Sequence, residues 1–109
     1  PRTLLLNNLI FMSKILGNTR DGRKVVATAG TAERLVSANT RCEKVTIMAE
    51  VDNTGYIVVG DSTVVATLAT RRGIPLSAGT SITIDIEDLY QVWINSEVSG
   101  DGVTYVYHF

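Results

Sequence analysis

From Lys24 to the last residue, the chain consists of short apolar runs that are interrupted by turn residues about every 8–12 residues. Val, Ile and Thr together make up 35 of the 109 residues. These β-branched side chains pack well on a pleated sheet and lose χ1 freedom in a helix. The spacing and the composition therefore exclude a helical bundle and predict an all-β domain over residues 24–109.

Most of the expected strands carry apolar side chains at every second position. Residues 44–51 are the clearest example, since Val45, Ile47, Ala49 and Val51 share one face. The run 56–59 is nearly all apolar, which predicts burial on both faces. Alternation of this kind is typical of two packed antiparallel sheets. We expect a jelly-roll-like antiparallel β-sandwich of about eight strands, at residues 24–28, 33–36, 44–51, 56–59, 63–68, 80–87, 90–95 and 103–109.

Turn residues between these runs predict the connections. Asp21-Gly22 lies within a turn over residues 20–23, and residues 99–102 form a hairpin tip. Residues 74–76 are expected in a loop, and residues 33–36 are a candidate partner strand for residues 24–28.

Residues 1–23 differ from the rest and are predicted to form an N-terminal arm, either extended or as a short helix. Residues 1–24 carry five basic side chains and Asp21, a net charge of +4. Residues 25–109 carry five basic and ten acidic side chains, a net charge of −5. One small sandwich cannot easily bury the apolar side chains of the arm as well. We therefore expect the arm to attach to another protein surface, such as the acidic body of a neighbouring copy.

Side chains with catalytic or ligand chemistry are sparse. His108, the only histidine, lies next to the last residue, where a preorganised site is hard to build. Cys42, the only cysteine, is interpreted as a small semi-buried apolar side chain. Asp85, Glu87 and Asp88 offer the oxygen ligands of a divalent cation, but the interpretation that we favour is a solvated strand face. We expect no enzyme, no cofactor and no metal site.

The sequence favours a protein partner over nucleic acid or a membrane. Basic residues do not form a run with interleaved aromatics, and no stretch has the roughly 18 apolar residues of a spanning helix. The apolar part of the arm lacks the cleavage site of a secretory signal, which predicts synthesis in the cytoplasm without export. Candidate interface residues are Leu4, Leu5, Leu9, Phe11 and Met12 in the arm, Arg71 and Arg72 in a loop, and Trp93.

Three segments, taken in their order and spacing, resemble a known class of protein. They are residues 53–60 (NTGYIVVG), 73–84 (GIPLSAGTSITI) and 92–105 (VWINSEVSGDGVTY). Together they are similar to small β-sandwich virion proteins of tailed bacteriophages, which are found as head decoration (cement) proteins or as tail-associated modules. The resemblance covers about residues 24–107 and leaves the arm outside.

The resemblance implies a structural role on the virion and no catalytic residues. We expect a capsid decoration protein on the head surface, which binds the major capsid protein and assembles with itself into a homotrimer. Many weak copies would then stabilise the shell through multivalency. The alternative is a binding module for a receptor or carbohydrate at the tail tip or on a tail fibre.

Overall fold

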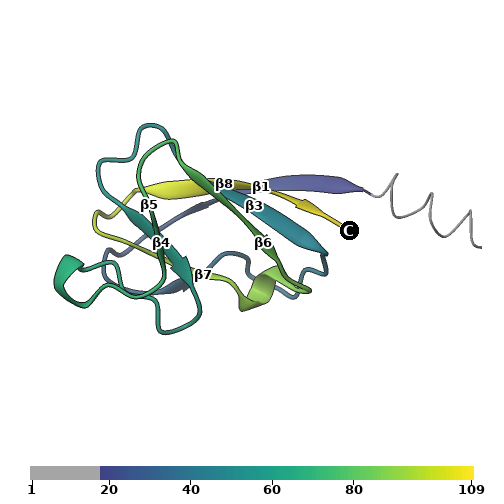
Figure 1. Ribbon diagram of the computed structural model, residues 1–109, viewed down its shortest axis with the longest axis horizontal. Coiled ribbons are helices and arrows are strands. Elements are labelled where there is room, and N and C mark those ends of the chain that lie inside the picture. Colours follow the sequence, from purple (N-terminus) through teal and green to yellow (C-terminus); the bar gives the residue numbers. More distant parts are fainter. Residues whose placement is uncertain (1–17) are drawn as a thin grey trace, which may run out of the picture.

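The computed structural model describes residues 18–109, which form two four-stranded antiparallel sheets (Figure 1). The strand order is β1-β8-β3-β6 in one sheet, called sheet A here, and β2-β7-β4-β5 in the other, called sheet B. The strands are β1 Thr19–Val25, β2 Glu33–Arg34, β3 Lys44–Ala49, β4 Ile57–Gly60, β5 Ile74–Leu76, β6 Ser81–Asp85, β7 Trp93–Ser96 and β8 Gly102–His108. Two short 3-10 helices, η1 Leu68–Thr70 and η2 Leu89–Gln91, are the only helices of the described part. The predicted all-β fold of two antiparallel sheets is confirmed.

The core lies between the sheets and is made by side chains that alternate along the strands. On β3, Val45, Ile47 and Ala49 are buried, whereas Met48 faces outward, as the alternation predicts. Val51 was expected on the buried face, but it follows the end of β3 and is 79% exposed. The core cluster also contains Val26, Leu35, Cys42, Ile57, Val59, Leu76, Leu89, Val92, Ile94 and Val103.

A second, smaller cluster covers the opposite face of sheet B. Val58 of β4 packs there against Val64 and Ala66, with Trp93 partly buried beside them. The buried run of β4 therefore faces two clusters. The predicted burial of residues 56–59 on both faces is confirmed for residues 57–59, whereas Tyr56 is 42% exposed. A strand was expected at residues 63–68, but these residues do not form one. Their buried side chains, Val64 and Ala66, pack onto sheet B, and the segment does not join the hydrogen-bonded strands of either sheet. Only Val65 forms an isolated bridge, with Arg72.

The expected turn at residues 20–23 is wrong, and so is the boundary of the arm at residue 23. These residues belong to β1, which pairs along its whole length with β8. Gly22 lies opposite Tyr105, and a Cβ atom at Gly22 would overlap the Tyr105 ring. The glycine therefore makes room for a neighbouring ring rather than for a turn. The rest of the predicted arm, residues 1–17, lies outside the described residues.

Three further local predictions are corrected by pairings between distant segments. Residues 33–34 form β2 and pair with β7, not with residues 24–28. Residues 74–76 form β5, where Pro75 is tolerated because β5 is an edge strand with one neighbour. Residues 99–102 are not a hairpin tip, because the chain there passes from β7 in sheet B to β8 in sheet A.

A hydrogen-bond network at this crossing joins residues 53–60 and 92–105, two of the segments that resemble phage virion proteins. The buried Asp101 carboxylate accepts the backbone N–H groups of Thr54 and Gly55, at 3.2 and 2.9 Å. The Asn53 amide donates to the Gly102 carbonyl and accepts the Gly102 N–H, at 2.8 and 2.9 Å. The loop between β3 and β4 is thereby held against the link between β7 and β8.

We expect Asn53→Ala to destabilise the fold, because it removes two hydrogen bonds and leaves both backbone groups of Gly102 without that partner. The expected loss of unfolding free energy is about 1–3 kcal/mol. Denaturant titration checks this, with Asn39→Ala as the matched control, since Asn39 is exposed. Equal stability of the two variants would show that this hydrogen-bond network does not stabilise the fold.

Candidate functional site

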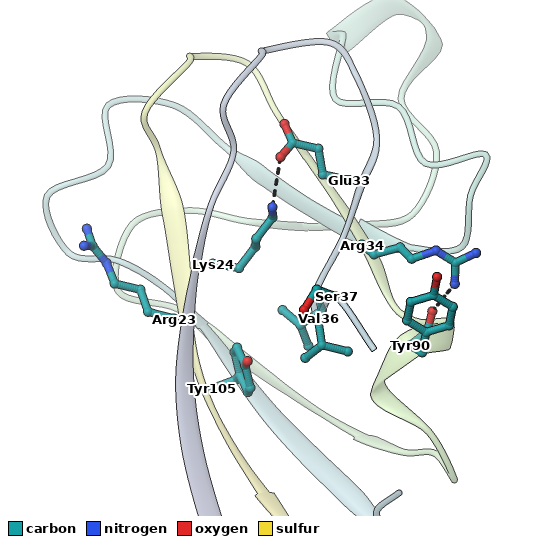
Figure 2. A pocket seen from close by; sticks show the side chains of 9 residues that line it. Arg23, Lys24, Glu33, Arg34, Val36, Ser37, Tyr90 and Tyr105 are labelled. Atoms are coloured by element: carbon teal, nitrogen blue, oxygen red, sulfur yellow. Dashed lines mark hydrogen bonds and ion pairs between the residues drawn. The ribbon is translucent and has the colours of Figure 1, made fainter. Parts of the chain in front are cut away.

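A hollow of about 600 Å³ opens between β1 and β2, which are edge strands of sheets A and B (Figure 2). Arg23 and Lys24 line it from β1, and Glu33 and Arg34 line it from β2. The remaining lining residues are Leu35, Val36, Ser37, Tyr90 and Tyr105. A volume of this size is typical of sites for small molecules or for part of a larger partner. Its charged and phenolic groups suit hydrogen bonding to a polar or anionic partner.

Arg34 is held in place by two aromatic rings. Its guanidinium carbon lies 3.7 Å from the centre of the Tyr90 ring and 4.5 Å from that of Trp93. One guanidinium N–H also donates to the Tyr90 carbonyl. A guanidinium has five N–H donors, so stacking leaves most of them for other partners. Figure 2 shows Arg34 over Tyr90, on the opposite side of the hollow from Arg23.

Lys24 and Glu33 form an ion pair across the mouth of the hollow, with Nζ and Oε1 3.0 Å apart. The other carboxylate oxygen of Glu33 accepts the N–H groups of Ala27 and Thr28. Burial raises the pKa of Glu33, but the Thr28 hydrogen bond, Lys24 and the Ala27 hydrogen bond together lower it below its ordinary value. The ionised carboxylate therefore fastens β2 to the end of β1.

The residues with catalytic or ligand chemistry have structural environments. The Cys42 thiol is buried and donates to the Ile86 carbonyl; burial and the charge of Asp88 raise its pKa. The Asp88 carboxylate accepts the N–H groups of Thr40 and Tyr90 and thereby caps the N-terminus of η2. Within residues 18–109, His, Cys, Asp and Glu side chains form no group of three that could hold a metal ion.

The predicted interface residues that can be placed fall into two clusters. Arg71 lies over the Tyr56 ring, donates to the Ala66 carbonyl and is 3.5 Å from a Glu97 oxygen. Arg72 is exposed beside it and pairs with Val65 through the backbone.

Trp93 belongs to the other cluster, where it packs partly buried on the outer face of sheet B beside Arg34. The five predicted interface residues of the arm lie outside the described residues: Leu4, Leu5, Leu9, Phe11 and Met12.

Sequence reasoning missed Arg34 and Tyr90. Arg34 is one of ten Lys and Arg residues, and its neighbours in the sequence do not distinguish it. Its environment arises because β2 pairs with β7, which places Arg34 directly opposite Trp93, and because η2 positions Tyr90. The sequence contains the three residues, but the signal lies in a pairing between distant segments.

Comparisons with family models, with curated proteins and with solved structures find no match to this chain. Among residues 18–109, no helix is long and apolar enough to cross a membrane.

We expect the stability of the fold to decrease as the pH falls through the lowered pKa of Glu33. Because the folded state holds this carboxylate ionised below the ordinary value of 4.5, the stabilisation is present above that value and is lost on protonation. Glu33→Gln should flatten this part of the acid limb. Unfolding free energies measured between about pH 7 and about pH 3 check the prediction.

The matched control is Glu43→Gln, because Glu43 is an exposed carboxylate. It should retain the acid limb of the original protein. The pKa values of Asp61 and Asp88 are lowered too, by hydrogen bonds first of all, so a weaker acid limb remains in Glu33→Gln. An acid limb that is equally steep with Glu33→Gln would contradict the prediction.

Proposed function

We propose that this chain is a structural protein of a tailed-bacteriophage virion, most specifically a decoration protein that binds the outside of the head shell. The proposal joins the resemblance of residues 24–107 to the observed pairing of the strands. It assigns no catalytic residue and no cofactor. The partners are the major capsid protein and further copies of this chain.

The observation that carries the proposal is the nested pairing of the strands. The first strand pairs with the last, β2 with β7, β3 with β6, and β4 with β5. A single long antiparallel hairpin that rolls up on itself gives this pattern, and we assign it as a jelly roll. Jelly rolls occur in viral capsid proteins and in lectin domains, so the fold supports a shell role without requiring it.

Self-assembly into a homotrimer is part of the proposal. Decoration proteins act through many weak contacts, and a trimer multiplies the contacts that each particle makes with the shell. The contrast between the basic N-terminal region and the acidic remainder, +4 against −5, favours contact between copies. Light scattering of the free protein should therefore give three times the monomer mass.

The alternative is a binding module of the tail tip or of a tail fibre. The hollow between β1 and β2 favours it, because a guanidinium fixed over Tyr90, in a hollow that Tyr105 also lines, suits a polar ligand such as a carbohydrate. Head and tail differ in where the protein is found on the virion.

Electron microscopy of virions labelled with an antibody against this chain distinguishes the two. We expect label over the whole head surface, since a decoration protein is present in many copies. Virions treated with antibody from an unimmunised animal are the control. Label confined to the tail would overturn the decoration proposal and support the binding module.

A deletion tests the part of the arm that precedes the sheet. Because Asn18 and Phe109 exchange two backbone hydrogen bonds at 3.0 Å, the deletion ends at Gly17. Removing residues 1–17 should leave the melting temperature unchanged and weaken co-sedimentation with capsids, since it removes the apolar side chains expected to attach.

The matched variant keeps the length and charge of the arm and replaces Leu4, Leu5 and Leu9 with Ser. It should weaken co-sedimentation as the deletion does. If the deletion unfolds the protein, residues 1–17 belong to the core; if both variants bind capsids normally, the arm is not the attachment site.

A further inference from the structure

The two sheets end in edges of different kinds. In sheet B, the edge strand β2 has two residues, and the edge strand β5 has three residues with Pro75 in the middle. Short edges and edge prolines are common ways to prevent a sheet from pairing with another chain. In sheet A, the edge strands β1 and β6 have seven and five residues and contain no proline. Within residues 18–109, each of them has a neighbour on one side only.

The two long edges carry opposite charges. β1 contains Arg20, Arg23 and Lys24 against Asp21, a net charge of +2. β6 and the three residues after it contain Asp85, Glu87 and Asp88, a net charge of −3. The edges lie on opposite sides of sheet A, with β8 and β3 between them. One copy thus offers a basic strand on one side and an acidic strand on the other.

The charged groups nearest the edges are accessible. Arg23 is 61% exposed although it forms an ion pair with Glu50 at 3.0 Å, and Arg20 lies over the Phe109 ring. Asp85 and Glu87 are exposed. Ion pairs of such exposed groups contribute little by themselves, so we expect the charges to select the partner strand while backbone hydrogen bonds hold it.

The backbone of β6 is oriented for this. Ala49 of β3 donates its N–H to the Thr80 carbonyl, which places the backbone groups of residue 80 toward β3. Backbone groups alternate sides along a strand, and the register continues as Ile47 with Ile82 and Val45 with Ile84. The N–H and C=O groups of Ser81, Thr83 and Asp85 therefore point to the free side.

We infer that β1 of one copy pairs with β6 of the next, so that sheet A continues from copy to copy. The four strands of sheet A alternate in direction, so β1 and β6 run in opposite directions and two copies in the same orientation present an antiparallel pair. The contact joins two different surfaces, so it repeats head to tail, and it gives a closed ring such as the proposed trimer when the rotation from copy to copy closes. It rests on the proposed self-assembly and names the surface that carries it.

Charge reversal tests the pairing in the full chain. Reversing β1 with Arg20→Glu and Arg23→Glu, or reversing β6 with Asp85→Lys and Glu87→Lys, should raise the dissociation constant of the oligomer at least about tenfold. All four changes in one chain should restore assembly, because the edges are again opposite in charge. Sedimentation at several concentrations measures this, and circular dichroism verifies that each variant is folded.

A proline variant tests the backbone part of the pairing. Thr83→Pro removes an N–H that points away from β3, so the monomer should fold but should not assemble. Thr83→Ala is the matched control, because both changes remove the hydroxyl contact of 2.9 Å with Thr46. Thr83→Ala should still assemble.

The outcomes separate this inference from the proposed function. If the original protein assembles and the reversed variants assemble equally well, the edge pairing is wrong and the decoration role stands. Loss of assembly on reversing Asp52 and Arg72, which are exposed in loops, with no loss on reversing the edges, would overturn it in favour of those loops. A protein that remains monomeric at high concentration overturns both the pairing and the trimer, whereas antibody labelling of the virion tests the decoration role independently.

Discussion

The two sheets are joined at one end by the hydrogen bonds that the buried Asp101 carboxylate accepts. This carboxylate holds the N–H groups of Thr54 and Gly55, while the Asp101 backbone accepts the Val26 N–H and the next residue, Gly102, exchanges two hydrogen bonds with Asn53. Three segments that are distant in the sequence therefore meet where the chain crosses from β7 to β8. Gly102 is needed there, since a Cβ atom would lie 2.7 Å from the Lys24 carbonyl oxygen. With this crossing in place, β8 can lie between β1 and β3.

The sequence was sufficient to predict the fold class and the inward faces of several strands, but not the neighbours of each strand. Alternation along residues 44–51 and the apolar run 56–59 depend only on which side chains avoid water. They are confirmed over residues 44–49 and 57–59, whereas Val51 and Tyr56 are exposed. The errors fall where a local signal meets a distant partner. Asp21-Gly22 has the sequence of a turn, yet it is straight strand because β8 pairs with it and the Tyr105 ring occupies the space beside Gly22.

The candidate site shows the same limit more strongly. The position of a hollow at the open side of a sandwich can be predicted only when the edge strands of both sheets are known. Here β2 was expected beside β1, whereas it pairs with β7. Without the pairing of β2 with β7, the sequence does not identify Arg34 as a site residue. Trp93 lies on the face of sheet B opposite Val92 and Ile94, but the sequence could not show that Arg34 and the small second cluster share its surface.

The structure shows where part of the charge difference between residues 1–24 and residues 25–109 lies. Arg20, Arg23 and Lys24 are not on an appendage; they lie on a strand that is an edge of the sheet, and the acidic residues around Asp85 lie on the opposite edge of the same sheet. A long, proline-free edge is a hazard in a protein that must stay monomeric, because it invites pairing with any other strand. Opposite charges on the two edges limit that hazard, since like edges repel each other and unlike edges attract. The same feature that would endanger an isolated sandwich therefore suits the proposed assembly of this chain with its own copies.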